Sequence, residues 1–322
     1  MLSRIAESLY WIGRYLERAD DTARILEIQL HQLLEDPSAN ENLVSHTLLA
    51  ALGITETENE IIDFHQAAIE LSFSLEQPSS ILSSVISVRE NARGIRESIS
   101  SELWESINVS YNSLRTYSVS KQRMGPRDFF QLSRIIRERI ALVTGTAEMT
   151  MARDDGWLFL LIGRSLERVD MTVRLLGARY ATAKKSSDWA ATLKSCSAHE
   201  IFLRIYGGNI TGPAVIEFLL LDRLFPRSVH FSLNAAELAL AQLSPDIGRT
   251  GPAEVARRTL GRARASLEFR DSGEIFHELP SHLVNLQSKC ALASAEISSR
   301  FFQRHLVNSW VQETPIIHLR GS

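Results

Sequence analysis

The chain has 322 residues, of which 44% are hydrophobic and 23% are charged, and its formal net charge is −3. These values are ordinary for a globular protein that has enough apolar residues for a large core. The slight excess of acidic residues argues against a nucleic-acid-binding protein that works through a broad basic face, because phosphate contacts require clusters of uncompensated Lys and Arg.

Other classes of protein are also disfavoured. The two cysteines, Cys196 and Cys290, lie far apart in the sequence and lack metal-binding spacing, as expected for reduced thiols in a cytosolic protein. Charged residues interrupt residues 1–17, so no signal-peptide core is present. The most apolar stretches, 157–163 and 218–221, are much shorter than the ~20 residues that cross a bilayer. We therefore expect a soluble, cytoplasmic protein without a membrane span.

Helical periodicity dominates the chain. In residues 9–26, apolar residues recur on one face at ~100° per residue, and Arg, Glu and Asp collect on the opposite face. A convincing period-2 run bounded by hairpin turns is not found, so a sheet is not expected. The pattern predicts an all-α fold. Comparable helical patterns occupy residues 81–103, 129–143, 201–206, 215–224, 229–243, 255–269 and 283–307.

Helix-breaking and helix-capping residues separate these segments. Thr55 and Glu58 have capping-box spacing, and Gly125-Pro126 is typical of the end of one helix and the start of the next. Further signals are a polar connector at 34–43, breaks at 207–209 and 244–248, and a tail after Trp310 that we expect to be poorly ordered.

The chain contains an internal repeat. Residues 12–26 align with residues 162–176 at a constant offset of 150, and ten of the 15 positions are identical. A shorter match, 78–81 against 226–229, follows in the same order. We therefore predict a multi-helix bundle of two duplicated halves, 1–150 and 151–322, which form one compact domain about a pseudo-two-fold axis.

The repeated helix carries a charged face. Its apolar positions differ between the two copies, whereas its Arg, Glu, Asp and Thr positions persist. Arg14, Glu17 and Arg18 stand at i, i+3 and i+4, a spacing that allows an ion-pair ladder along one helix. The candidate site consists of Arg14, Glu17, Arg18, Asp20, Arg24, Arg164, Glu167, Arg168, Asp170 and Arg174.

Three interpretations of this face are open. It can be a structural network of Glu and Arg that fixes how the two halves pack. It can line a polar cavity in which Arg14, Arg18, Arg164 and Arg168 bind a carboxylate or phosphate, because guanidinium groups favour such planar anions. It can also be an exposed face that docks a partner.

A second basic cluster consists of Arg89, Arg93 and Arg96, which stand at i, i+4 and i+7. Glu90 and Glu97 alternate with these arginines, so a solvated, salt-bridged helix face is the favoured interpretation. Arg257, Arg258, Arg262 and Arg264 form a loose counterpart.

Catalytic motifs are mostly absent from the sequence. It has no phosphate-binding GxxxxGK[ST] loop, no HExxH, no GxSxG and no Gly-rich dinucleotide fingerprint. Glu274 and His277 have the spacing used in di-iron bundles, but the second such pair and the two further carboxylates are missing. We therefore expect no metal and no cofactor, and no catalytic residue can be assigned.

Several motifs together resemble the bacterial Alpha-E family, an uncharacterised alpha-helical domain with a conserved ER motif. The resemblance covers essentially the whole chain, and its ER motif corresponds to Glu17-Arg18 and Glu167-Arg168. Ser74 stands where the family commonly has Asp in its first half, whereas Asp222 is present in the second, so we expect any role of that Asp not to be duplicated. The motifs lie at residues 9–19, 89–93, 101–105, 155–157, 163–168, 217–222 and 225–229.

The resemblance implies a bacterial protein encoded beside a circularly permuted ATP-grasp amide ligase and a transglutaminase-like peptidase. We therefore expect an accessory or binding subunit of an amide-ligase system, without catalytic activity of its own, and neither nucleic acid nor membrane as a partner. The alternative is a helical enzyme that processes an anionic amino-acid or peptide intermediate in the Arg/Glu cavity. A third, weaker hypothesis is a metal-dependent helical oxidoreductase.

Overall fold

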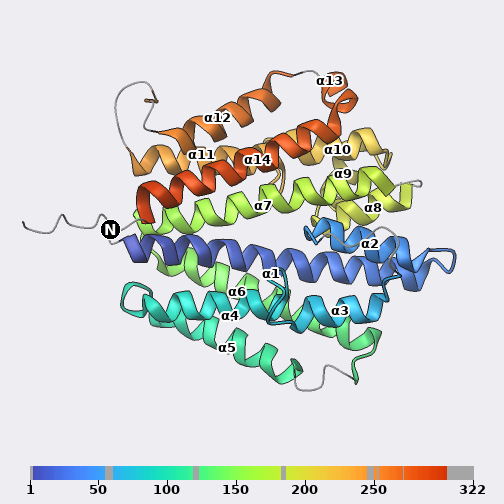
Figure 1. The fold of residues 1–322 in the computed structure, drawn as a ribbon, viewed down its shortest axis with the longest axis horizontal. Helices are drawn as coiled ribbons and strands as arrows, with labels where there is room; N and C mark the ends of the chain where they lie inside the picture. Colours follow the sequence, from blue (N-terminus) through green and yellow to red (C-terminus); the bar gives the residue numbers. More distant parts are fainter. Residues whose placement is uncertain are drawn as a thin grey trace, which may run out of the picture.

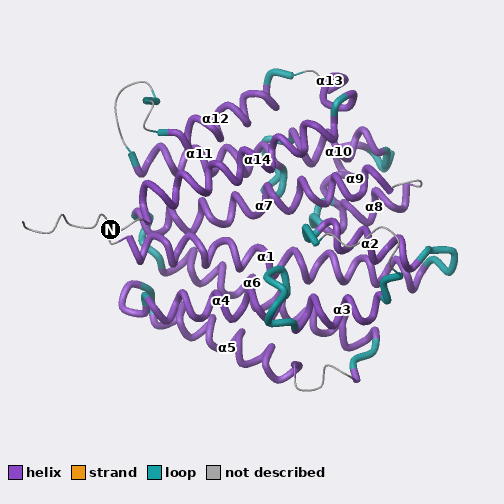
Figure 2. Tube along the Cα trace, in the orientation of Figure 1, coloured by secondary structure: helices purple, strands orange, loops and turns teal. Residues whose placement is uncertain are grey.

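The computed structural model describes residues 3–54, 61–118, 123–182, 186–244, 250–251, 254–270 and 272–302. These residues form helices joined by short loops, and no strand occurs among them (Figure 2). The prediction of an all-α fold is confirmed. The helices are α1 (Ser3–Glu35), α2 (Glu41–Ala51), α3 (Phe64–Phe73), α4 (Ile81–Gly94), the 3₁₀ helix η1 (Arg96–Ser98), α5 (Ser101–Ser118), α6 (Pro126–Thr150), α7 (Asp155–Thr182), α8 (Ser186–Ser195), α9 (His199–Tyr206), α10 (Gly212–Leu221), α11 (Val229–Leu243), α12 (Val255–Glu268), α13 (Ser272–His277), α14 (Leu279–Ile297) and a π-helical turn (Ser298–Phe302).

Two long helices, α1 and α7, lie side by side through the middle of the molecule (Figure 1). Helix α1 also packs against α4 and α6, and α5 packs on both of these. Helix α7 packs against α11 and α14, and α12 packs on both of these. One continuous apolar core joins the two groups of helices. Among the described helices, none is both long and apolar enough to span a membrane.

The two central helices approach each other closely at a pair of glycines. A Cβ atom on Gly13 would lie 2.2 Å from the carbonyl oxygen of Leu160, and a Cβ on Gly163 would lie 2.0 Å from the carbonyl oxygen of Tyr10. Because these atoms belong to the backbone, any larger residue would force the two helices apart, so glycine is favoured at both positions. Gly13 and Gly163 occupy the same position in the sequence repeat, as do Tyr10 and Leu160, so the two contacts are reciprocal.

The loops before α4 and α11 use equivalent hydrogen bonds. Ser80 caps α4 by accepting from the Ser83 amide, and Ser228 caps α11 by accepting from the Phe231 amide. Thr22 of α1 donates to the Ser79 carbonyl at 3.1 Å, and Thr172 of α7 donates to the Arg227 carbonyl at 3.3 Å. Each loop is therefore attached in the same way to one of the central helices.

One prediction about these loops is wrong. The Asp222 carboxylate accepts from the amides of Leu224 and Phe225, and the Ser74 hydroxyl accepts from the amides of Glu76 and Gln77. A hydroxyl oxygen and a carboxylate oxygen both accept backbone N–H groups in such turns. The turn-forming role of Asp222 is therefore duplicated at Ser74, although the residue type is not.

Several predicted element boundaries are altered in the structure. The pattern at 81–103 is two helices, because α4 ends at Gly94 and α5 starts after Ser100, whose hydroxyl accepts from the Leu103 amide. The predicted connector at 34–43 is shorter, since α1 continues to Glu35 and α2 begins at Glu41. Pro126 begins α6 as predicted, but Gly125 is the N-cap of that helix with φ of −100°, and the preceding helix ends at Ser118. The predicted break at Gly207 is confirmed. The predicted capping box at 55–58, most of the 244–248 break and the tail after Trp310 lie outside the described residues.

Candidate functional site

The duplicated Glu and Arg residues pair across the contact between α1 and α7. Arg168 of α7 donates to Glu17 of α1 through Nε and Nη2, each at 2.8 Å. In the other direction, Glu167 of α7 accepts from Nε of Arg14 and Nε of Arg18, both at 2.5 Å. Each glutamate is thus neutralised by arginines of the opposite helix.

The predicted ladder within a single helix is therefore wrong. The salt bridges of Glu17 are made with Arg164, Arg168 and Arg227, all outside its own helix. The spacing of Arg14, Glu17 and Arg18 also suits two parallel helices that touch at this face, and the Gly13 and Gly163 contacts bring the helices close enough for the exchange.

Both glutamates are buried, with 4% of Glu17 and 1% of Glu167 exposed. Burial alone would raise the pKa of a carboxyl group, because it disfavours the charged form. For Glu17, the charges of Arg168 and Arg227 outweigh this effect and lower the pKa to about 2. For Glu167, the charges of Arg14 and Arg18 outweigh it and lower the pKa. Both side chains are therefore ionised at neutral pH.

The Glu17 side of the contact is a closed side, because its carboxylates are buried and are paired with arginines of the protein. Asp20 and Asp21 of α1 are also buried, and the guanidinium of Arg227 contacts all three carboxylates. Arg227 comes from the loop before α11, and it lies 2.9 Å from Glu17 and 2.5 Å from Asp20. Within the described residues, these three carboxylates are the group with metal-ligand spacing. Because Arg227 contacts all three, the cluster is built around a guanidinium.

Asp21 is the carboxylate of this cluster that is least stable as an anion. Burial, together with the charges of Glu17 and Asp20, outweighs the attraction of Arg227 and raises the pKa of Asp21 to about 7. The nearby Cys196 is also buried, and burial raises the pKa of its thiol to about 12. The Glu17 side therefore combines one strongly ionised carboxylate with one that titrates near neutrality.

The two remaining acid–base pairs of the predicted cluster are formed within single helices. Arg24 donates to Asp20 at 2.8 Å, and Arg174 donates to Asp170 at 3.0 Å, each pair at i, i+4. Arg24 also contacts Ser197, and a Cβ atom on Gly53 would collide with the guanidinium of Arg174. These two contact residues both have a left-handed backbone, with φ of 52° at Ser197 and 73° at Gly53.

Beside Glu167, in contrast, the charges border an open cleft of about 810 Å³. The cleft lies between α1, α7 and α14. Its charged lining is Arg14, Arg18, Asp170 and Arg174, and α14 contributes mostly Ser and Ala. Cys290 also lines the cleft, but it is buried. The structure thus brings four members of the predicted cluster to one accessible place, and the buried Glu167 pairs with two of them.

Two aromatic residues organise the arginines of the cleft. Trp11 and Tyr15 stack with ring centroids 5.5 Å apart, and the guanidinium of Arg18 lies 5.4 Å from the Tyr15 ring. Arg14 donates to the Tyr10 hydroxyl at 3.2 Å. Because Glu167 and Tyr10 favour the charged guanidinium more than burial disfavours it, the pKa of Arg14 is raised above its usual range. Both arginines are therefore held in place.

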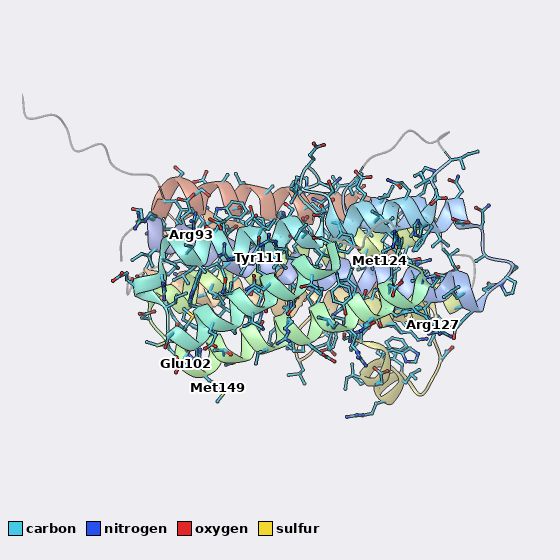
Figure 3. All side chains as sticks on the ribbon, turned by 90° about the horizontal axis from the view of Figure 1, so that it is seen from below. Arg93, Glu102, Tyr111, Met124, Arg127 and Met149 are labelled. Carbon is cyan, nitrogen blue, oxygen red and sulfur yellow. The ribbon has the colours of Figure 1, made fainter. Side chains whose placement is uncertain are left out.

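The second basic cluster is a separate surface feature. Arg89 donates to Asn108 at 2.9 Å and lies 4.7 Å from the centre of the Tyr111 ring, so it joins α4 to α5. Arg93 pairs with Glu90, and its side chain is 66% exposed. Arg93 is labelled in Figure 3. The prediction that Arg96 shares their helix is wrong, because α4 ends at Gly94 and Arg96 lies in η1.

The Glu274–His277 pair falls in α13, where His277 is exposed, and the side chain of Glu274 lies outside the described residues.

Sequence reasoning missed two residues that complete the Glu17 side, Asp21 and Arg227. A signal for them exists in the repeat. Asp21 corresponds to Met171, and Arg227 corresponds to Ser79, so the acidic residue occurs only in the first copy and the basic residue only in the second. Two complementary departures of this kind indicate an ion pair, which the structure contains.

Comparison with known proteins places the chain in a family. The family model described as a predicted alpha-helical domain with a conserved ER motif, Alpha-E, matches residues 1–302. The chain belongs to the Alpha-E family. The Glu-Arg dipeptides that give the motif its name in this chain are Glu17-Arg18 and Glu167-Arg168, and each glutamate forms a salt bridge with the arginine of the other dipeptide.

Relatives among curated proteins are bacterial. Uncharacterised proteins of Mycobacterium bovis and of two strains of Mycobacterium tuberculosis are each 27% identical over 285 residues. The match covers 82% of this chain but only 32% of each relative, so the chain spans about a third of the length of these relatives. No solved structure matches significantly.

Proposed function

We propose that this Alpha-E protein is an accessory, ligand-binding subunit of a bacterial amide-ligase system, and that the cleft beside Glu167 holds an anionic group of the substrate. The single observation that carries the proposal is the accessible excess of guanidinium groups in this cleft. Arg14, Arg18 and Arg174 stand against two carboxylates, Glu167 and Asp170.

The geometry of these arginines supports anion binding. Within the described residues, Nη2 of Arg14 and Nη1 of Arg18 make no hydrogen bond, whereas the Nε atoms are held by Glu167. Guanidinium N–H groups that are fixed in orientation and left unpaired suit a carboxylate or a phosphate, because either anion accepts several hydrogen bonds in one plane. Glu167 thus positions the arginines, and the ligand would supply the missing negative charge.

Binding is favoured over catalysis by the two groups that would be the first candidates for chemistry. Burial raises the pKa of the Cys290 thiol to about 12, so the nucleophilic thiolate is scarcely populated at neutral pH. The lowered pKa of Glu167 makes it a weak base, and its oxygens are already occupied by Arg14 and Arg18.

The partner in this proposal follows from the family resemblance, which implies a circularly permuted ATP-grasp ligase and a transglutaminase-like peptidase encoded nearby. The length of the mycobacterial relatives supports a role beside other domains, because two thirds of each relative lies outside the match. Since an ATP-dependent ligase requires ATP, we place the protein in the bacterial cytoplasm.

We also infer that the chain arose by duplication of a helical half, and that 1–150 and 151–322 are related by an approximate two-fold axis between α1 and α7. The inference is supported by the reciprocal Gly13 and Gly163 contacts, the exchanged Glu–Arg pairs and the matching caps at Ser80 and Ser228.

The proposal is tested by reconstitution with the neighbouring ligase. ATP turnover is measured over candidate amino acids with no addition, with the wild-type protein, with Arg18→Gln, and with Arg134→Gln as a control at an exposed arginine of α6. We expect the wild type and Arg134→Gln to stimulate turnover equally and Arg18→Gln to stimulate it much less. Turnover that is the same with and without the wild-type protein for every candidate would refute the proposal.

A further inference from the structure

The cleft is longer than a single amino acid requires. The wall formed by α14 and the first residue of the π-helical turn runs from Gln287 to Ser298, and at 1.5 Å per residue this stretch is about 17 Å long. The opposite wall consists of α1 from Trp11 to Arg18 and of α7 from Asp170 to Arg174. An extended peptide advances about 3.3 Å per residue, so a trough of this length matches about five residues.

The wall on α14 is suited to a peptide backbone. Its residues along the trough are small or polar, among them Ser288, Ala291, Ser294, Ala295 and Ser298. Small side chains allow an extended chain to approach the helix closely. The Ser288 hydroxyl already donates to the Val284 carbonyl, and its oxygen can still accept from a peptide N–H. Trp11, stacked on Tyr15, adds an apolar surface at one end of the trough.

The charges of the trough favour an acidic ligand, and the elements that line it favour a peptide over a nucleotide. Phosphate chains of nucleotides are typically bound by helix N-termini and glycine-rich loops, where backbone N–H groups converge. The trough is instead lined by middle turns of α1 and α7 and by the C-terminal half of α14. Its anion-binding groups are the side chains of arginines that Glu167 has already oriented.

We propose that this trough binds an extended, acidic peptide of about five residues, with a carboxylate on Arg14 and Arg18 and an apolar side chain against Trp11. The inference rests on the proposed function, since it specifies the substrate class of the same cleft. It adds that the ligand is a peptide and that contacts along the trough contribute to its binding.

The proposal is tested by isothermal titration calorimetry on the full chain. The probes are free glutamate, a Glu-Glu dipeptide, a hexapeptide Gly-Ala-Leu-Ala-Glu-Glu, its Gln-Gln amide counterpart, and ATP. We expect the hexapeptide to bind at least about tenfold more tightly than free glutamate. The Gln-Gln amide counterpart, which has no carboxylate, should bind at least about tenfold more weakly than the hexapeptide.

A variant that blocks the trough tests the peptide contacts separately from the contacts to the arginines. Ala295 is exposed and lines the Trp11 end, so Ala295→Phe fills the trough without removing an Arg–Glu pair. We expect this variant to lose at least about tenfold in hexapeptide affinity while its affinity for free glutamate stays unchanged. Leu292→Phe is the control, because Leu292 is 48% exposed on the same helix but does not line the trough.

The results distinguish the two proposals. If glutamate binds in an Arg18-dependent way but the hexapeptide binds no more tightly, or if Ala295→Phe leaves hexapeptide binding unchanged, the peptide assignment is wrong and anion binding stands. If ATP binds more tightly than the hexapeptide and displaces it, the ligand is a nucleotide and the peptide assignment is again wrong. If none of the anions binds, the proposed function fails as well.

Discussion

The two sides of the α1–α7 contact start from the same sequence motif and differ in how the buried charge is completed. Glu17 pairs with two arginines of α7 and with Arg227 from the loop before α11. Arg227 also pairs with Asp20 and Asp21. Glu167 has Arg14 and Arg18, which border an open cleft.

This difference supports the proposal that the Glu17 side is a structural ion cluster and that the Glu167 side binds a ligand. Ion pairs taken out of water contribute little net stability, but an unpaired buried charge is strongly destabilising. On the Glu17 side, three carboxylates are buried together, and arginines of the protein supply their counter-charges. On the Glu167 side, solvent or a ligand can reach the arginines, so an incomplete network is tolerated.

The largest expected effect comes from opening the closed side. Arg227→Met would leave Glu17, Asp20 and Asp21 buried without their shared guanidinium. We expect the free energy of unfolding to fall by about 3–5 kcal/mol in urea titrations. Arg223→Met is the control, because Arg223 is 68% exposed, and it should change stability by less than about 1 kcal/mol. Equal effects of the two substitutions would contradict the closed network.

A pH dependence between pH 4 and pH 7 should arise on the closed side, from Asp21. The raised pKa of Asp21 means that the native state keeps its proton between pH 4 and pH 7, whereas the unfolded chain loses it at about pH 4. Stability from this group is therefore complete below about pH 4 and is lost as the pH rises to about 7.

Comparison with Asp21→Asn measures this contribution. Relative to the wild type, the variant should gain stability steadily from pH 4 to pH 7 and no further above it. At about 1.4 kcal/mol per pKa unit, the gain amounts to at most about 4 kcal/mol. Contributions of Glu17 at lower pH occur in both proteins and cancel. A stability difference that does not vary with pH, from urea titrations at four pH values, would show that Asp21 is ionised throughout.

At the close contact between α1 and α7, substitution of the glycine of either helix should lower the free energy of unfolding by a similar amount. Gly13→Ala and Gly163→Ala each place a Cβ atom against backbone of the other helix, so we expect each to cost about 1–3 kcal/mol of unfolding free energy. Gly145→Ala is the control within α6, where a Cβ meets nothing within 4 Å, and it should be neutral or stabilising by up to about 1 kcal/mol. A large difference between Gly13→Ala and Gly163→Ala would break the equivalence of the two helices.

The smallest stability effect is expected at the open side. Arg18→Gln leaves Glu167 paired with Arg14, and water in the cleft can reach the substituted side chain. The free energy of unfolding from thermal melts should therefore change by only about 1 kcal/mol. A loss as large as that of Arg227→Met would mean that the Arg18 pair is as structural as the Glu17 cluster.

The sequence was sufficient for the helical fold and for the charged face, because the 3.6-residue periodicity and the repeat at 12–26 and 162–176 are local features. It could not decide which arginine pairs with which glutamate. The spacing of Arg14, Glu17 and Arg18 fits both a ladder within one helix and an exchange between two, and only the close approach at Gly13 selects the exchange.

The cleft itself could not be predicted from sequence. It depends on α14, which follows α7 by about a hundred residues and lies along the arginines with its Ser and Ala positions. Arg227 was similarly hidden, since its loop reaches Asp21 from 206 positions away in the chain. Comparison of the copies reveals the Asp21–Arg227 pair only when two departures from the repeat are considered together.

The most direct test of the account compares Arg18 with its counterpart Arg168. The acidic hexapeptide is titrated calorimetrically into Arg18→Gln and Arg168→Gln, at a temperature where circular dichroism shows both variants to be folded. We expect Arg18→Gln to lose at least about tenfold in hexapeptide affinity and Arg168→Gln to stay within about twofold of the wild-type affinity. Equal losses in the two variants, or unchanged binding in Arg18→Gln, would contradict the assignment of ligand binding to the open side.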